Sequence, residues 1–580
     1  MRSEELYYDV VVIGGGLLGC FAARNLTRYD LKVALLEKRE DLCTGISRAN
    51  TAIVYSGCDT KPGTIKTSMC VRSAQKFTQL CDELGVRYSP CGSIMVSFGE
   101  RGARVLREKL DFGTQNGVHG MRLLSGKEVL ALEPNIAPGV FSGLYVPDTG
   151  TVMPWELCFA AAENAADNGV EMMLNTEVTA ITRQGSGVRG QGSGDESTGM
   201  RSGAAQGSGV RGQGSGDEDT GMRSGAAQGS GDESTGDGYR ISTNRGTFFA
   251  RGIINCAGMS ADGVLEMLFE PTVRIVPSAG DYYILDTKAA GHIRHVIFHE
   301  PEEKGKGLTL VPTVDGNILV GPTERPGDDY ETSGAGLDEL SELVSLVIPT
   351  LPMGHVIRSF GAVRPNPYRL RAGKPELRME NGELRIGDGR MRSGDAQLSV
   401  ARGQGSGDES AGDGYVLDDR SVSDFCIIES DGGAFVSLVG VKTPGLTCAN
   451  ELGMHTADKV AVRLNAVVNT NYKSRRTSPV RLSHMPFDER ELYLRDKDPC
   501  YSRIICRCRG ISEGEIVDAI HRFPGATTLD GVKRRTGAGS GRCQSGFCGQ
   551  RVIELLASEL HCAPEDIAKD GKGSYFFIKK

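Results

Sequence analysis

Apolar and polar positions divide the chain into short strands and amphipathic helices that alternate along it. YDVVVIGGG (8–16) predicts a buried strand and a turn, residues 17–28 a helix, and KVALLEK (32–38) a second strand. The segment 153–169 has apolar residues at a spacing near 3.6, which predicts a helix. GNILVGPT (316–323) and GAFVSLVGV (433–441) are typical of short buried strands. This alternation predicts an α/β fold.

Two stretches lack the apolar positions that a core requires. Residues 184–238 consist almost wholly of small, polar and charged residues, and VRGQGSGDE occurs at Val188 and again at Val210. Residues 390–414 have a similar composition and repeat some of the same short sequences. A solenoid would need apolar positions in each repeat, so we expect solvated, disordered insertions, although composition alone leaves a regulatory or adhesive role open. Excising 184–238 joins two alternating segments, which predicts that this insertion sits at a hairpin tip.

Composition and charge narrow the class of protein. The chain has 580 residues, a net charge of −8 and 24% charged residues, which predicts a globular protein of three or four domains and disfavours nucleic acid as a partner. The longest apolar run, Val10–Ala23, contains four glycines, so we expect no transmembrane segment. The N-terminus is acidic, unlike that of a signal peptide. The sixteen cysteines are more typical of free thiols and metal ligands than of disulfides. Together these features predict a cytoplasmic location.

A glycine motif directly follows the first predicted strand. Gly14, Gly16 and Gly19 have G-x-G-x-x-G spacing and open the first predicted helix. Such glycines permit a tight turn, a close approach of pyrophosphate to the backbone and close packing of helix on strand. Glu37 ends the second strand 18 residues after Gly19, where a carboxylate can accept the hydroxyls of a ribose. The sequence therefore predicts a dinucleotide site.

Five further segments resemble one family of flavoproteins. These are TGISRANTAIVYSGCDTKPGTIKT, IINCAG, LTLVPTVDGNILVGPT, SFGAVRPNP and FVSLVGVKTPGLTCANELG. In this order they resemble FAD-dependent oxidoreductases of the D-amino-acid-oxidase-like superfamily, in the branch of anaerobic glycerol-3-phosphate dehydrogenase and L-2-hydroxyglutarate oxidase. The resemblance covers roughly residues 7 to 465 apart from the insertions.

The resemblance implies an extended FAD and names further residues that hold it. Those near the diphosphate and flavin would be Ser47, Asn50 and Thr51; Val178 would hold the adenine by its backbone; Ala257 and Gly258 would close over the diphosphate; and Gly440, Lys442, Thr443, Gly445 and Leu446 would form the loop beneath the flavin ring. Relatives often read IVHAG where this chain reads IVYSG, with Tyr55 in place of the histidine. We therefore predict non-covalent FAD.

The family's strand and loop facing the flavin resemble SAGDYYIL (278–285) and VRPNP (363–367). Arg364 is the predicted ligand of an anionic substrate, because a guanidinium offers a planar fork of donors to a carboxylate or phosphate. Tyr282 adds a hydroxyl. Oxidation of an alcohol also needs a base, and HIRHVIFHEP offers His292, His295 and His299, of which His299 is our choice. A structural ion pair for Arg364 and a structural role for His299 remain open alternatives.

Four C-terminal cysteines form two closely spaced pairs. Cys506 and Cys508 are separated by one residue, and Cys543 and Cys548 by four. Between the pairs, SEGEIVDAIHRF has an N-cap serine and helical apolar spacing. Four thiolates can hold zinc or an iron–sulfur cluster. The pattern resembles the bacterioferritin-associated ferredoxin (BFD)-like [2Fe–2S] domain, which favours the cluster; Cys500 and Cys562 lie outside it.

The predicted organisation is an α/β protein with three parts. A Rossmann-like FAD-binding domain and an interleaved antiparallel-sheet substrate domain (α+β) precede a small helical [2Fe–2S] domain. The predicted boundaries are 1–90, 150–183, 239–262 and 415–470 for FAD binding, 91–149 and 263–389 for the substrate domain, 471–499 for a linker, 500–560 for the BFD-like domain and 561–580 for a tail.

A flavin accepts a hydride, whereas a [2Fe–2S] cluster carries single electrons. The resemblance therefore implies a dehydrogenase that passes electrons to a second flavoprotein or iron–sulfur subunit, with a link to quinone. Its leading substrate is sn-glycerol 3-phosphate, oxidised to dihydroxyacetone phosphate. The alternatives are an L-2-hydroxyglutarate or amino-acid dehydrogenase on the same scaffold, and a non-catalytic electron-relay or redox-sensing subunit.

Overall fold

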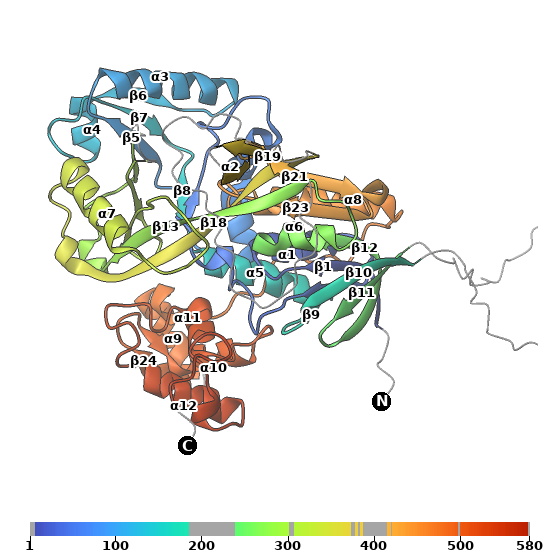
Figure 1. The fold of residues 1–580 in the computed structure, drawn as a ribbon. Helices are drawn as coiled ribbons and strands as arrows, with labels where there is room; N and C mark the ends of the chain where they lie inside the picture. The colour runs from blue at the N-terminus through green and yellow to red at the C-terminus, as the bar shows by residue number, and fades with distance from the viewer. Residues whose placement is uncertain are drawn as a thin grey trace, which may run out of the picture.

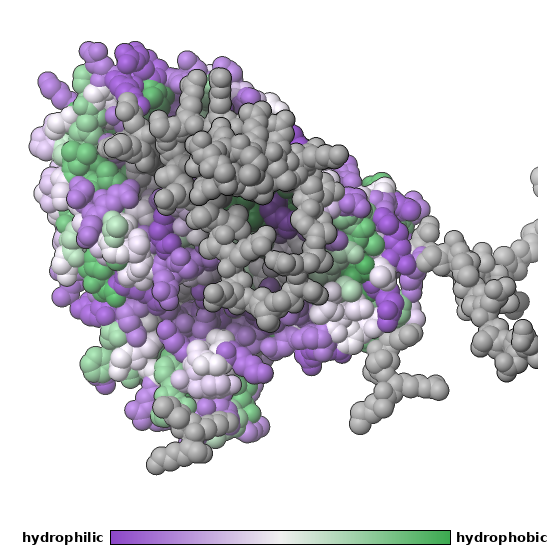
Figure 2. Space-filling model, viewed as in Figure 1, coloured by the Kyte–Doolittle hydropathy of each residue, from purple (hydrophilic) through white to green (hydrophobic). Residues whose placement is uncertain are grey.

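A computed structural model describes residues 6–184, 238–300, 307–372, 377–380, 383–386, 415–418, 420–496 and 499–577. The expectations for the two low-complexity stretches lie outside these residues, apart from the strand ends that flank the first stretch. On the face drawn in Figure 2, hydrophilic residues predominate and the hydrophobic ones form small separate patches. This distribution is ordinary for a chain in which 24% of the residues are charged.

The first sheet holds the glycine motif, and its centre is parallel. Its strands, in spatial order, are β10 (Val178–Gln184), β11 (Gly238–Thr243), β12 (Gly246–Asn255), β1 (Leu6–Ile13), β2 (Val33–Leu36) and β9 (Glu171–Met173). β23 (Phe435–Val439) extends the parallel part from β12, and β22 (Cys426–Ser430) pairs antiparallel with β23. Val10 and Val12 face one core cluster and Val11 and Ile13 the other, which explains the unbroken apolar run of β1.

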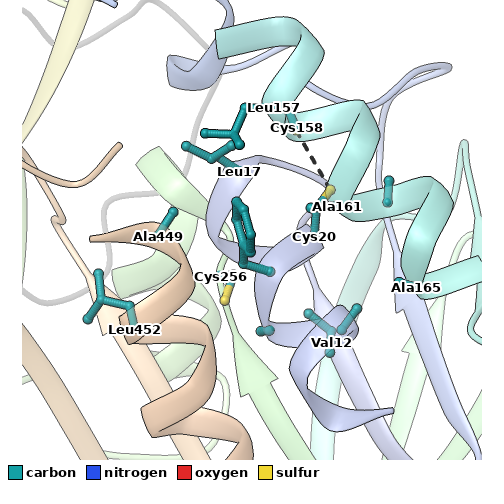
Figure 3. Close-up of a cluster of buried hydrophobic side chains, with 14 of the residues drawn as sticks. Val12, Leu17, Cys20, Leu157, Cys158, Ala161, Ala165, Cys256, Ala449 and Leu452 are labelled. Carbon is teal, nitrogen blue, oxygen red and sulfur yellow. Dashed lines mark hydrogen bonds between the residues drawn. The ribbon is translucent and has the colours of Figure 1, made fainter. Parts of the chain in front are cut away.

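Helices cover both faces of this sheet (Figure 1). On one face α1 (Leu17–Leu26) packs between α5 (Pro154–Asp167) and α8 (Ala449–Arg463), as Figure 3 shows. α2 (Ile65–Leu84) contacts α5 and α8 on the same side. The short helix α6 (Ala261–Glu266) packs on the other face. The α/β prediction and the strands and helices expected near residues 8–38 and 153–169 are confirmed.

The second sheet is largely antiparallel and forms one wall of the cavity described below. Its order is β21 (Tyr415–Leu417), β18 (Val356–Ala372), β13 (Val273–Leu285), β16 (Ile318–Val320), β15 (Thr309–Pro312), β14 (Val296–His299), β5 (Ser93–Ser97), β7 (Ser142–Val146) and β6 (Arg122–Ser125), with β17 (Arg325–Pro326) beside β13. Its helices are α3 (Glu100–Gln115), α4 (Gly126–Leu132) and α7 (Gly334–Val347). The smaller sheets are β3 (Ile53–Val54), β8 (Gly150–Val152) and β4 (Tyr88–Ser89), and the pair β19 (Leu377–Glu380) and β20 (Glu383–Ile386).

The hairpin expected around the first insertion is present. β10 and β11 run antiparallel, and Gln184 lies opposite Gly238 at the end of the pair. Residues 184 and 238 are therefore neighbours in space although 53 residues separate them in the sequence. The chain leaves and re-enters the sheet at one point, where added length costs little conformational free energy.

The C-terminal region forms its own lobe beside α5 and β18 (Figure 1). Its elements are α9 (Phe487–Asp496), β24 (Ile504–Cys506), β25 (Ile511–Ser512), α10 (Glu513–His521), α11 (Leu529–Thr536) and α12 (Gly549–Glu559). Ser512 caps α10 in a capping box with Glu515, as the sequence predicts.

The stretch 471–499 differs from the linker that was predicted for it. It contains α9, and Arg476 is buried against Glu163 of α5, with Nε 2.8 Å from Oε2. The predicted tail is likewise docked, because Asp570 forms ion pairs with Arg48 and Arg534. Charge in these segments therefore marks polar contacts between parts of the chain rather than solvated connections.

Candidate functional site

The three glycines after β1 make a turn that only small residues can form. Gly14 has φ 106°, in the left-handed region that side chains rarely adopt. A Cβ on Gly19 would overlap the carbonyl oxygen of Gly14, so the third glycine lets α1 begin against the turn. Gly16 is the N-cap of α1, and the Leu17 N–H donates to Ser47 Oγ at 2.9 Å. The turn thus presents backbone and a helix N-terminus, a combination that suits phosphate.

Glu37 lies where β2 ends and is 9% exposed. Its Oε2 accepts the N–H of Gly15 at 2.6 Å and its Oε1 accepts the N–H of Arg39 at 2.9 Å. Burial raises the pKa of this carboxyl, against the lowering effect of both hydrogen bonds. The carboxylate therefore closes the glycine turn and also faces the neighbouring cavity.

A cavity of about 740 Å³ starts at this turn and runs between the two large sheets. It is large enough for an extended dinucleotide together with a small substrate. The predicted cofactor residues that line it are Gly14, Gly16, Glu37, Ser47, Asn50, Thr51, Val178, Ala257, Gly258, Lys442, Thr443, Gly445 and Leu446. Gly19 and Gly440 shape the walls instead. Gly440 has φ 63°, and a Cβ there would crowd Pro367 of β18.

The three predicted catalytic residues meet in this same cavity. Arg364 comes from β18, Tyr282 from the neighbouring β13, and His299 from the end of β14. Nη1 of Arg364 lies 3.2 Å from Oε1 of Glu324. Burial raises the pKa of Tyr282 to about 12, although the Arg364 guanidinium beside it acts in the opposite direction. A buried phenol that keeps its proton next to a cation can donate a hydrogen bond to an anionic substrate.

His299 is the one of the three candidate histidines that lines the cavity within the described chain. It is 5% exposed, and its ring lies 5.7 Å from that of Phe98. His295 instead places Nδ1 2.7 Å from Oε1 of Glu133, away from the cavity. An imidazole with an apolar neighbour and a cavity in front of it can accept the proton of a substrate hydroxyl.

Sequence reasoning missed five charged residues that line the cavity, which are Lys38, Arg39, Asp59, Lys109 and Glu177. Asp59 follows β3 in a loop, and Lys109 lies on α3 of the second sheet's layer. Asp59 lies within one of the segments that carry the family resemblance, whereas no motif marks Lys109. Tyr55, by contrast, was singled out, and it lies in the cavity with its ring 6.1 Å from that of Phe298.

The four predicted metal-ligating cysteines gather in the C-terminal lobe as two pairs. Sγ of Cys508 and Sγ of Cys543 are 3.6 Å apart, and Cys506 and Cys548 share a hydrogen bond. Within the described residues no three His, Cys, Asp or Glu side chains converge on one metal position. Two irons with two thiolates each match an arrangement in pairs.

The surroundings of Cys506 favour its thiolate, whereas the hydrogen bond with Cys506 raises the pKa of Cys548 and burial raises that of Cys508. The pKa of Cys506 falls to about 6, first through its hydrogen bond with Cys548 and then, against burial, through backbone N–H groups of Gly539, Arg509 and Cys508. Gln544 and Ser545, between the second pair, have φ 47° and 72°. Several backbone N–H groups directed at the Cys506 sulfur provide an environment that suits an iron–sulfur cluster.

Comparison with known families decides the assignment of the main part of the chain. The family described as DAO: FAD dependent oxidoreductase matches residues 9–206 and 223–400. This chain belongs to that family. Residues 504–558 match the BFD-like [2Fe-2S] binding domain. FAD and a [2Fe–2S] cluster are therefore its cofactors, and the glycine turn, Glu37 and the four paired cysteines are residues of the kind that each one needs.

Curated relatives agree with the resemblance. The chain is 32% identical to a glycerol 3-phosphate dehydrogenase of Caloramator mitchellensis over 98% of both proteins. It is 26% identical to a glycerol 3-phosphate oxidase of Mycoplasma pneumoniae, covering 62% of this chain and 83% of that one. An L-2-hydroxyglutarate dehydrogenase of Bos taurus is 26% identical over 55% of this chain and 62% of its own length.

Solved structures share the fold. An L-α-glycerophosphate oxidase of Mycoplasma pneumoniae with FAD bound matches 82% of this chain and all of its own, with a TM-score of 0.60 and 22% identity. A glycerol-3-phosphate dehydrogenase of Bacillus halodurans complexed with FAD matches 97% of this chain and 92% of its own, with a TM-score of 0.56 and 15% identity. Among the helices of the described residues, none is long and apolar enough to cross a membrane.

Proposed function

We propose that this oxidoreductase converts sn-glycerol 3-phosphate to dihydroxyacetone phosphate and passes the electrons through its [2Fe–2S] cluster to a partner. The observation that carries the proposal is one cavity with a dinucleotide turn at one end and Arg364, Tyr282 and His299 at the other. A relative of that activity, aligned over 98% of both chains, supports the choice of substrate. Matches of this chain to both family models support the pairing of the two cofactors in one chain.

The residues divide the work of substrate binding and deprotonation. The Arg364 guanidinium binds the phosphate, and Tyr282 donates a hydrogen bond to it. His299 accepts the proton of the C2 hydroxyl, so that the C2 hydrogen can leave with its electron pair and a ketone remains. When bound, FAD supplies the acceptor for that hydride.

Electrons then leave one at a time through the cluster. Cys508 is exposed, so the side of the lobe that carries this cysteine is open to another molecule. We propose a second flavoprotein or an iron–sulfur subunit as the acceptor, with an eventual link to quinone, and a cytoplasmic location for the enzyme. Pull-down of the tagged holoenzyme in reducing buffer tests for such a partner. The control is a variant in which the charge of Arg507, the residue before Cys508, is reversed.

The test of the substrate is reduction of the bound flavin without oxygen. The holoenzyme is mixed anaerobically with sn-glycerol 3-phosphate, its enantiomer sn-glycerol 1-phosphate, or L-2-hydroxyglutarate, and flavin absorbance is followed by stopped flow. We expect fast bleaching by sn-glycerol 3-phosphate and at least 100-fold slower bleaching by the enantiomer. Fast bleaching by L-2-hydroxyglutarate alone would overturn the proposal.

That outcome would establish the second candidate, an L-2-hydroxyglutarate or amino-acid dehydrogenase, which the bovine relative favours. A phosphate dianion and a carboxylate differ in charge and number of oxygens, and Lys109 is one of several cations besides Arg364 that line the cavity and suit the dianion. If no small substrate bleaches the flavin, the protein is instead an electron-relay or redox-sensing subunit.

A further inference from the structure

A second cavity lies between the C-terminal lobe and the part of the described chain that contains the two large sheets, which we call the flavin-side body. Its volume is about 410 Å³, within the roughly 300–1,000 Å³ range of small-molecule sites. Ala49, Asn50 and Tyr330 line both this cavity and the larger one, so the two cavities share a wall. Its far side is formed by residues of the lobe that carries the cysteines, among them Arg509 and Gln544. The proposed substrate and flavin sites do not use this space.

Three aromatic side chains line the cavity. They are Trp155 at the start of α5, Tyr330, whose ring has the Arg48 guanidinium 4.7 Å from its centroid, and Phe360 of β18. Trp155 Nε1 donates to the Arg48 carbonyl at 2.8 Å, which fixes the orientation of the indole. Phe360 stacks on Tyr282 with ring centroids 4.7 Å apart. Rigid aromatic walls of this kind suit a planar ring.

The same cavity carries a surplus of positive charge. Among the described residues that line it, six are cations and three are carboxylates. Two of the carboxylates already bind arginines: Asp570 lies 2.9 Å from Arg48 and 2.6 Å from Arg534, and Asp315 lies 2.7 Å from Arg87. The acids therefore leave part of the positive charge in the cavity uncompensated.

Arg358 carries part of this surplus, and the charge of Lys533 interacts with it. Lys533 is 8% exposed and is 3.5 Å from Asp530, and burial lowers its pKa to about 8, with Asp530 opposing and Arg358 adding to the effect. Nη1 of Arg358 lies 3.3 Å from the neutral Oε1 of Gln544. A buried ammonium and a guanidinium with a neutral hydrogen-bond partner are stabilised when an anion enters between them.

We propose that this cavity binds a mononucleotide, its ring between the aromatic walls of Trp155, Tyr330 and Phe360 and its phosphate at Lys533 and Arg358. A phosphate matches the two cations, and a planar ring matches the apolar remainder of the lining. The bound molecule would contact both the flavin-side body and the cluster lobe. Such a ligand would hold the two redox domains in one relative position.

The single tryptophan of the chain makes the test direct, because Trp155 lies in the wall of the cavity. The FAD-loaded, cluster-containing protein is titrated with AMP while Trp155 fluorescence is followed, and with riboflavin 5′-phosphate in equilibrium dialysis. We expect saturable binding of at least one of the two. Adenosine, riboflavin and inorganic phosphate each lack the ring or the phosphate and should bind at least tenfold more weakly.

Two variants place the binding in this cavity. Lys533→Gln and Arg358→Gln should each weaken mononucleotide binding at least tenfold, whereas Lys127→Gln, an exposed lysine on α4, should leave it unchanged. Flavin content and iron content of each variant, measured first, show that it has folded. Absence of binding by both mononucleotides at millimolar concentration, or equal binding by all variants, would overturn the proposal.

Discussion

Arg364 carries the recognition of the substrate anion in this account. Replacing it by methionine removes charge-assisted hydrogen bonds worth about 1.5–3 kcal/mol each, so kcat/KM should fall about 100-fold or more. Arg364→Lys should restore part of the loss, because it keeps the charge but not the planar fork. Steady-state kinetics with an artificial acceptor measures the effect. Arg369→Met, on the same strand but exposed, should leave kcat/KM unchanged, and an unaltered KM in Arg364→Met would contradict the assignment.

Tyr55 bears on how the flavin is held. It occupies the position of the histidine that relatives often carry, and a phenol offers no imidazole for a covalent link. We therefore expect acid precipitation of the holoenzyme to release all flavin into the supernatant, measured by absorbance. Flavin that stays with the pellet would show that another residue carries it covalently.

The three candidate histidines show what the sequence alone could and could not decide about the catalytic base. HIRHVIFHEP contains three candidate bases, and the spacing does not reveal which one faces a cavity. The fold separates them, because β14 pairs with β5 and ends at His299 in the cavity, while His295 bonds Glu133. Lys109 could not be found from the sequence, since only tertiary packing brings α3 to the cavity.

At the scale of elements, the β10–β11 hairpin gives a clean test of the first insertion. Gln184 and Gly238 are paired, so residues 185–237 can be replaced by Asn-Gly, a turn that suits a two-residue hairpin. The free energy of unfolding should change by no more than about 1 kcal/mol, because loop length contributes little to stability. Urea unfolding and flavin content provide the measurement. Loss of FAD in the shortened protein would show that the insertion supports the site.

One buried carboxylate, Asp41, contributes strongly to docking of the C-terminal lobe. Asp41 lies 2.7 Å from Arg534 and also 2.7 Å from Arg535, whose guanidinium stands 4.0 Å from the Phe159 ring centroid. Burial acts to raise the pKa of Asp41, but the two arginines hold it below its ordinary value. Asp41→Asn leaves the buried Arg535 without its anion and Arg534 with Asp570 alone, and should cost about 3–5 kcal/mol. Urea unfolding followed by Trp155 fluorescence measures this, with the exposed Asp488→Asn as control.

The ion pairs of Asp41 with Arg534 and Arg535 predict the sign of a pH effect on stability. Because the folded pKa of Asp41 lies below the unfolded value, its contribution to stability is present above the ordinary aspartate pKa of 3.8 and is lost as the pH falls below it. Wild-type protein should therefore lose more stability than Asp41→Asn between pH 5 and acid conditions of about pH 3. Parallel stability curves for the two proteins would contradict this role.

Helices and strands with a strong apolar periodicity were predictable from the sequence, whereas the polar contacts that join distant segments were not. Strand β1, helix α1 and the capped helix α10 follow from apolar spacing and cap residues that act locally. Residues 471–499 were expected to be a linker, because the partners of their charges lie far away in sequence: Arg476 bonds Glu163, 313 residues earlier. Long-range ion pairs leave no periodic signal.

For the whole molecule, the central feature is the union of two redox sites in one chain. The cavity for FAD and substrate lies between the two large sheets, while the paired cysteines lie in a lobe fixed to α5 and to the glycine-turn side through Asp41. The sequence predicted both sites from separate local motifs. Their arrangement, including the second cavity between them, comes only from the fold.

The most direct measurement follows both redox sites at once. Anaerobic holoenzyme is mixed with sn-glycerol 3-phosphate, and samples are examined for flavin absorbance and for the electron paramagnetic resonance of a reduced [2Fe–2S] cluster. The account predicts that flavin bleaching is followed by the cluster signal, and that Cys543→Ser abolishes the signal but not the bleaching. A flavin that bleaches while an intact cluster stays oxidised would contradict it.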